Sequence, residues 1–207
     1  MRLNDLRALQ DAPAEQLRGK IVLLTRRMDR RTDGSGYADV LPMRSSAASI
    51  AAGKGAVALL IRSIGTDSNR LPHTGSVIYE GGVAIPAAAV SAPDTDLLER
   101  LTAQPAPVRI TLDLQSVAGT ATSYNVIGEI TGRDARPGVV LLAAHLDSWD
   151  AGTGAVDDGF GVGLVMATGR AHQAIRPGAA SYRARGAVRQ RGERLRRRQG
   201  LRGAGCG

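Results

Sequence analysis

The chain has 207 residues, of which 43% are hydrophobic and only 3% aromatic, so it is long enough to bury a core that must be mainly aliphatic. No apolar run reaches the roughly 18–20 residues of a membrane helix, and Cys206 is the single cysteine, so we expect no membrane partner and no internal disulfide bond. The net charge of +8 does not indicate a specific nucleic-acid partner, because residues 171–207 hold 10 Arg and one acidic residue, whereas residues 1–170 hold 17 basic and 18 acidic residues.

The first predicted elements lie in residues 1–62. Residues 1–18 have leucines near helical spacing, which predicts a short amphipathic helix. The apolar run in "GKIVLLTRRM" predicts a buried strand behind a turn glycine. The segment "SSAASIAAGKGAVALLIRS" predicts a helix that stops at Gly53 or Gly55 and is followed by a strand.

Strands and helices continue to alternate up to residue 117. "GGVAIPAAAVS" predicts a strand, and "APDTDLLERLTAQ" predicts a short helix with Asp94 or Thr95 as its cap. "APVRITLDLQSVAGTATSYNVIGEITG" predicts two strands with alternating side chains. We therefore predict a compact, β-rich domain with helices that ends near Val117.

Residues 118–170 have the pattern of an α/β sheet. "VVLLAAH" is a continuous apolar run, typical of a buried central strand, and "DDGFGVGLVMATG" is an apolar helix candidate weakened by three glycines. The polar loop between them occupies the place where open α/β sheets bind their ligands, outside the carboxyl end of a strand.

Residues 171–207 differ in kind, because Arg, Ala and Gly dominate this segment. Few large aliphatic residues remain there, and they follow neither a period of 2 nor one of 3.6. Such a segment cannot bury enough apolar surface to offset its ordering entropy, so we predict a disordered tail.

The loop "AHLDSWDAGTGAVDDG" combines one histidine with four carboxylates. His145 and Asp147 are two residues apart at the end of a strand, so their side chains share a face, as a metal ligand and the carboxylate that orients it would. Asp157 follows after a glycine-rich stretch, and a carboxylate can bridge two cations. A catalytic zinc needs about three protein ligands, so the other ligands must come from elsewhere.

Each acidic residue of the loop also has a purely structural interpretation. Asp157 could cap the helix that follows it, and Asp158 could stabilise the same helix end through the helix dipole. Asp150 could be a solvated turn residue. Spacing alone leaves these alternatives open, because short motifs occur often by chance.

The motif "HLDSWDAGTGAVDDG" resembles the metal-binding signature of the carboxypeptidase Q-like family of zinc aminopeptidases. Upstream segments, among them "GAVALLIRSIGTD", "RLPHTGSVIYEGG" and "SYNVIGEITG", resemble the same family in the same order. The resemblance implies a remnant of the peptidase domain at 1–18, an inserted protease-associated domain at 19–117 and an incomplete α/β zinc-peptidase domain at 118–170. Residues 171–207 would then be a tail outside these domains.

The resemblance also implies a site with two zinc ions, in which His145 ligates one zinc, Asp157 bridges both and Asp147 supports the site. Its substrates would be short peptides, and intact members are usually secreted or periplasmic. The Glu–Glu pair that supplies the general base in this family has no counterpart, since Glu193 is the only acidic residue after Asp158. A frameshift between about residues 169 and 183 would explain this, because suitable codons of 186–194 encode a Glu–Glu pair when shifted by one base.

The sequence therefore predicts a fragment of a zinc exopeptidase that cleaves near a free end of short peptides and is inactive as given. The first alternative is a non-catalytic interaction module formed by residues 19–117. The second is a nucleic-acid binder that acts through the basic tail. Oligomeric state and substrate preference are left open.

Overall fold

The computed structural model describes residues 1–73, 75–82, 84–115, 120, 122–130, 139–149 and 152–175. The chain divides into two compact units, Met1–Val117 and Ala118–Gly207. The elements of the first unit, in chain order, are β1 (Arg2–Leu3), α1 (Leu6–Asp11), α2 (Ala14–Leu17), β2 (Ile21–Leu24), α3 (Ser35–Ser45), α4 (Ala47–Gly53), β3 (Ala58–Arg62), β4 (Ala87–Val90) and α5 (Ala92–Thr102). Those of the second unit are η1 (Ala155–Gly159) and α6 (Phe160–Ile175).

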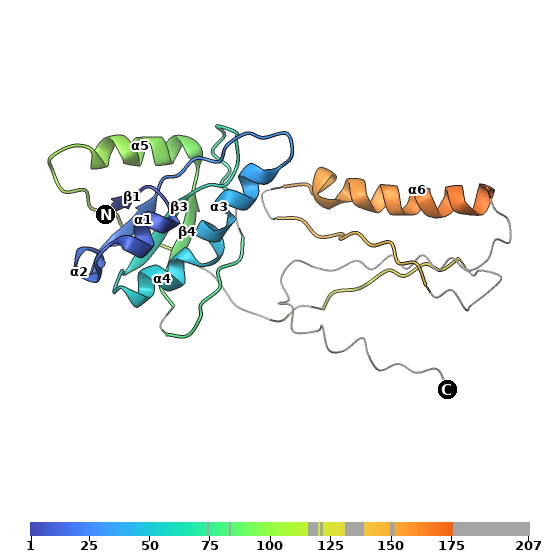
Figure 1. Cartoon of the computed structure of the whole chain (residues 1–207), viewed down its shortest axis with the longest axis horizontal. Coiled ribbons are helices and arrows are strands. Elements are labelled where there is room, and N and C mark those ends of the chain that lie inside the picture. Colours follow the sequence, from blue (N-terminus) through green and yellow to red (C-terminus); the bar gives the residue numbers. More distant parts are fainter. Residues whose placement is uncertain are drawn as a thin grey trace. The chain divides into compact units, whose positions relative to one another are not determined.

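The first unit is built on a four-stranded parallel sheet in the order β1-β2-β3-β4. Helices α1 to α4 lie on one face of this sheet and α5 lies on the other (Figure 1). Residues of β2 and β3 are nearly all buried, as their continuous apolar sequences predict. Alternate side chains divide between the two faces, and those that face α1–α4 join a core of leucine, valine, isoleucine and alanine.

Residues 1–18 belong to this core, and they do not form the single helix that their leucine spacing predicted. Pro13 separates α1 from α2, since proline has no backbone N–H to donate and favours the first turn of a new helix. Leu9 and Leu17 are completely buried. Lys54 Nζ donates to the carbonyl oxygens of Leu9 and Ala12, at 3.0 and 2.6 Å, which fastens the end of α1 to α4.

The described residues of the first unit do not bear out the β-rich character predicted for it. Its helices contain more residues than its strands, and α3 was not predicted. Residues 105–115 and 122–130 contain no assigned strand in the part that the structure describes, although alternating strands were expected there. The cap of α5 also differs, because the Ser91 hydroxyl accepts the backbone N–H of Asp94, and neither Asp94 nor Thr95 is the cap.

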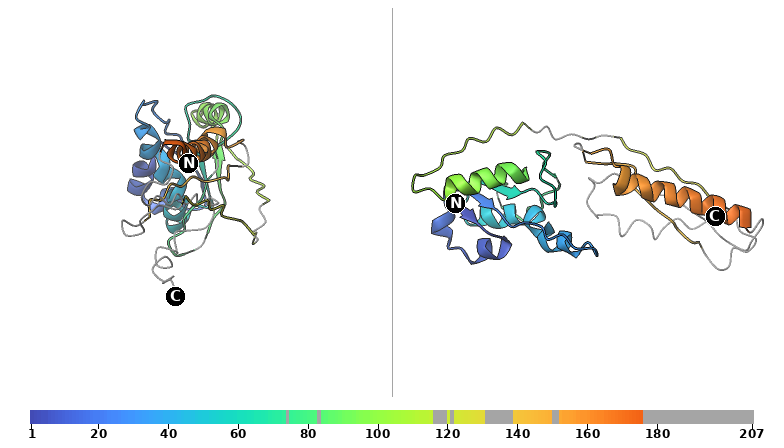
Figure 2. Two further views of the ribbon diagram at one scale, coloured as in Figure 1. Left: turned by 90° about the vertical axis from the view of Figure 1, so that its right-hand side faces the viewer. Right: turned by 90° about the horizontal axis from the view of Figure 1, so that it is seen from above.

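In the second unit, an extended segment of residues 139–149 runs beside α6 (Figures 1 and 2). No strand is assigned within 139–149, although "VVLLAAH" predicted one. A strand requires a hydrogen-bonded neighbour, and the described residues provide no such ladder to this segment. Val140, Leu141, Phe160 and Met166 are all largely exposed, so the segment is not buried as its continuous apolar sequence predicted.

Helix α6 confirms the predicted apolar helix and continues to Ile175, five residues into the segment that was assigned to the tail. Residues 176–207 lie outside the described residues, as do Asp150, Glu193 and Cys206. In the described parts of the chain, no helix combines the length and the apolar character needed to cross a bilayer.

Candidate metal site

Residues 152–159, which precede α6, bring Asp157 and Asp158 back to His145. Gly154 precedes η1 with φ 67°, a left-handed conformation that glycine adopts at little cost. Asp157 and Asp158 have non-helical backbone angles, with φ/ψ of −114°/88° and −133°/31°. The peptide bond that joins them is cis. The backbone angles of both residues thus depart from helical geometry just before α6 begins.

The three predicted site residues meet at the imidazole of His145. Its Nε2 lies 2.8 Å from Asp157 Oδ1, and its Nδ1 lies 3.1 Å from Asp147 Oδ1 and 3.0 Å from the Asp147 carbonyl oxygen. The side chains of His145, Asp147 and Asp157 are 20%, 16% and 54% exposed, respectively. The ring is thus held from one side by Asp147 while its second nitrogen faces the more exposed Asp157.

Asp158 has a role that the sequence reasoning missed. Its Oδ2 accepts the backbone N–H of His145 at 3.2 Å, which fixes the backbone of the histidine. The same carboxylate covers the first turn of α6, where a Cβ added to Gly161 would lie only 2.6 Å from Asp158 Cγ. The one available signal was the position of Asp158 next to Asp157, together with a glycine three residues later.

The Asp157 carboxylate contacts His145 Nε2 at 2.8 Å, and its interpretation as the cap of the helix that follows stays a prediction. Asp158 does lie at the start of α6, so a favourable interaction with the helix dipole is compatible with its contact to His145. The solvated-turn interpretation of Asp150 falls outside the described residues.

The donor set fits part of a zinc site. Two ligands of a tetrahedral zinc are about 3.4 Å apart, given metal–ligand bonds of about 2.1 Å. The 2.8 Å between His145 Nε2 and Asp157 Oδ1 would need to open by only about 0.6 Å, and Asp147 already sits on the other ring nitrogen as a supporting carboxylate. Among the residues that the structure describes, no group of three or more His, Cys, Asp or Glu residues that could hold a metal occurs.

Comparisons with known proteins find relatives of this chain. Residues 125–184 match the family described as Peptidase family M28. Carboxypeptidase Q of Homo sapiens is 38% identical over 152 residues, which cover 72% of this chain and 30% of the relative. The chain is related to the M28 peptidases. Carboxypeptidase Q of Xenopus laevis is 42% identical over 127 residues, covering 60% of this chain and 27% of that relative.

A solved M28 relative shares the fold of nearly the whole chain. This peptidase M28 precursor from Shewanella amazonensis SB2B is 43% identical, with a TM-score of 0.80 over 91% of this chain and 43% of that chain. The zinc aminopeptidase BSAP of Bacillus subtilis is 21% identical, with a TM-score of 0.53 over 90% of this chain and 39% of that chain, which shows a similar fold. The chain spans about 30% of the length of the carboxypeptidase Q relatives that it matches. The chain is therefore related to peptidases, which are hydrolases, and the solved structures similar to it include a zinc aminopeptidase.

Proposed function

We propose that His145 and Asp157 hold a zinc ion in the site of an exopeptidase, which in its intact form hydrolyses peptide bonds near a free end of short peptides. The observation that carries this proposal is the 2.8 Å contact between His145 Nε2 and Asp157 Oδ1, with Asp147 on the other ring nitrogen. A histidine that is oriented through Nδ1 by a carboxylate presents Nε2 to a metal in a fixed direction. The relationship to the M28 peptidases supports the substrate class.

Each residue of the site has a separate task in this proposal. The backbone carbonyl oxygen of Asp147, 3.0 Å away, keeps the proton of His145 on Nδ1 with the Asp147 carboxylate beside it, and Asp158 holds the histidine backbone through its N–H. Zinc, when bound, supplies polarisation of the scissile carbonyl and lowers the pKa of a bound water. The sequence contains no Glu–Glu pair after α6 that could accept the proton of that water. We therefore propose that the 207-residue chain itself does not turn over peptides, and that a second zinc bridged by Asp157 requires further ligands.

The test is a zinc titration of the full chain after treatment with a chelator, followed by competition with a chromophoric zinc indicator. We expect one zinc per chain, with affinity lost in His145→Ala and in Asp157→Asn because each removes one of two ligands. His172→Ala is the matched control and should bind zinc like the unaltered chain. Equal zinc affinity in His145→Ala would reject the site, and turnover of an aminoacyl p-nitroanilide or a dipeptide would reject the inactivity.

A second candidate function is that of a non-catalytic protease-associated module, predicted at residues 19–117, and the separate core and sheet of the first unit, Met1–Val117, support a module that also includes residues 1–18. Such a module would position substrates or contact other proteins. Expression of Met1–Val117 alone checks this idea, with a folded circular-dichroism spectrum and peptide binding as the expected results.

A secreted or periplasmic location of the intact protein is part of the main proposal, and fractionation of cells that produce it would test it.

A further inference from the structure

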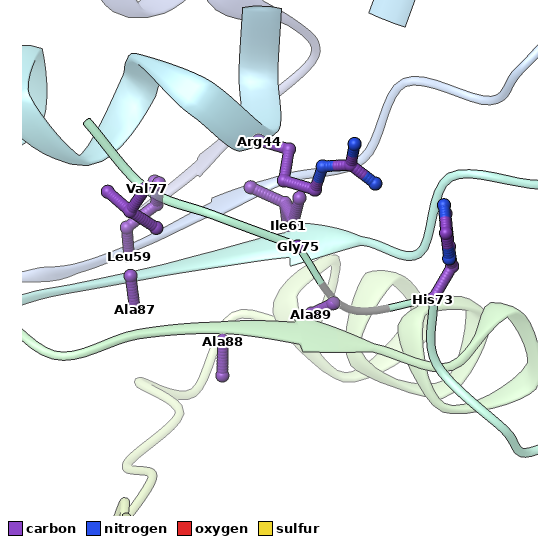
Figure 3. Close-up of a pocket in the computed structure, with 9 residues that line it drawn as sticks. All are labelled: Arg44, Leu59, Ile61, His73, Gly75, Val77, Ala87, Ala88 and Ala89. Carbon is purple, nitrogen blue, oxygen red and sulfur yellow. The ribbon is translucent and has the colours of Figure 1, made fainter. Parts of the chain in front are cut away.

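A half-enclosed pocket of about 230 Å³ lies in the first unit, on the face of the sheet that α1–α4 cover (Figure 3). Its floor is aliphatic, because Leu59 and Ile61 of β3 are almost completely buried there. Ala87 and Ala89 continue the floor along β4, and Val77 covers it from the connection before β4. The engineered cavity of about 150 Å³ that binds benzene is smaller, so this pocket has room for a ligand of roughly six to nine non-hydrogen atoms.

The polar groups of the pocket gather at one end. Figure 3 shows the guanidinium of Arg44 and the imidazole of His73 on the same side, with Leu59 and Val77 toward the other end. The described residues that line the pocket thus provide two nitrogen-bearing side chains and no carboxylate. A ligand with an anionic head and an aliphatic body matches both ends.

Arg44 is held in place from two sides. Its Nη2 donates to the Tyr37 hydroxyl at 2.7 Å, and its Cζ lies 5.6 Å from the centre of the Tyr37 ring. On its other side lies Gly75, where an added Cβ would be only 2.7 Å from Arg44 Cζ, so a larger residue there would displace the guanidinium from this position. The His73 backbone N–H donates to the Ser63 hydroxyl at 2.7 Å, which fixes the second polar residue of the same end. A charge that is already positioned loses less entropy when it binds a carboxylate.

We propose that this pocket binds a small branched aliphatic carboxylate. The hydrocarbon would cover Leu59, Ile61 and Val77, and the carboxylate would accept hydrogen bonds from the Arg44 guanidinium next to His73. A free amino acid fits less well, because its ammonium group would lie near the charge of Arg44 and the described lining residues provide no carboxylate to pair with it. Either a free carboxylic acid or the carboxyl-terminal residue of an acylated peptide carries this chemistry. The proposal does not depend on the zinc site in the second unit.

Isothermal titration and ¹H–¹⁵N NMR of the full chain test this proposal with four probes. They are 4-methylpentanoate, its neutral amide, N-acetyl-L-leucinate and L-leucine. We expect 4-methylpentanoate to bind at least about 10-fold more tightly than the amide, because the amide lacks the charge that pairs with a guanidinium. The shifted amide signals should include Ile61 and Gly75. Tighter binding of N-acetyl-L-leucinate would identify a peptide terminus as the natural source, and weaker binding would identify a free acid.

Variants then attribute the binding to the proposed residue. Arg44→Gln should lower the affinity for 4-methylpentanoate by about 10-fold or more, whereas Arg100→Gln on α5 should leave it unchanged. Tyr37→Phe keeps the guanidinium but removes its hydroxyl acceptor, and should weaken binding several-fold. Equal binding of acid and amide to the unaltered chain would overturn the proposal whatever the variants do, as would shifted signals confined to residues outside the pocket.

Discussion

Arg62 at the end of β3 is a buried cation, and its main partner, Asp96, lies on α5. Its Nη1 is 2.6 Å from Asp96 Oδ1, and its side chain is 7% exposed whereas that of Asp96 is 35% exposed. Arg27 Nη2 contacts the same Asp96 oxygen at 2.7 Å. We predict that Asp96→Asn destabilises the first unit, because the substitution leaves a buried guanidinium without the charge that faces it most closely.

The structure sets the size of this effect. Removing one partner of a fully buried ion pair costs about 3–5 kcal/mol. Two features reduce that figure here, since solvent screens the partly exposed Asp96 and Glu99 Oε2 remains 4.0 Å from Arg62. We therefore expect a loss of about 1–2 kcal/mol, which is roughly a 5- to 30-fold fall in the ratio of folded to unfolded chain.

The assay is urea unfolding followed by far-ultraviolet circular dichroism, with hydrogen exchange of the β3 amides to locate the effect. Asp11→Asn is the control, because Asp11 is 3.9 Å from Arg7 and the two side chains are 75% and 90% exposed. Such a surface pair should contribute little.

The effect of Asp96→Asn should also depend on pH. The hydrogen bond from Arg62, followed by the charges of Arg62 and Arg27, lowers the pKa of Asp96 from its usual 3.8. The stabilising contribution of a carboxylate with a lowered pKa is complete above its unfolded-state value and disappears as the pH falls through the lower, folded-state value. The difference between the unaltered chain and Asp96→Asn should therefore persist at pH 6 and shrink below about pH 3.8. An Asp96→Asn unfolding midpoint equal to that of Asp11→Asn, or a difference that does not shrink in acid, would refute the reasoning.

Three further results are expected. Leu59→Ala should lower the free energy of unfolding by about 2–5 kcal/mol in urea titrations, because it empties buried space, whereas Val57→Ala at an exposed position should change it by less than about 1 kcal/mol. Gly161→Ala should weaken zinc binding by displacing Asp158, whereas Gly163→Ala, where an added Cβ meets nothing within 4 Å, should not; equal zinc affinities would contradict the proposed support. Zinc affinity should fall as the solution is acidified from pH 7.5 to 5.5, because only a neutral imidazole binds a metal, and an affinity independent of pH would count against a histidine ligand.

The strands that the sequence predicted well are those that are buried on both faces. The runs behind β2 and β3 are apolar enough to identify a central strand without knowledge of its neighbours. Helix α3 was missed because it contains Gly36 and has Pro42 in its interior, which local propensity disfavours. Its packing on the core, through Val40 and Met43, is a tertiary effect that the sequence alone does not show.

The spacing of residues along the sequence predicted one part of the candidate metal site. The two-residue separation of His145 and Asp147 indicated that they share a face, and the structure places them in contact. The approach of Asp157 and Asp158 depends on the backbone angles of a short loop before α6, which residue types specify only weakly. The contact of Asp158 with the backbone N–H of His145 therefore could not be predicted from the sequence and is seen only in the structure.

In the first unit, strands that follow one another along the chain are also neighbours in the sheet, from β1 through β4. During synthesis, each new strand can therefore pair with the one that left the ribosome just before it, and no early strand must wait for a distant partner. Short intervals between paired strands favour rapid folding. Slowing translation after residue 62 should thus leave β1 to β3 already joined, with α5 still missing from the second face.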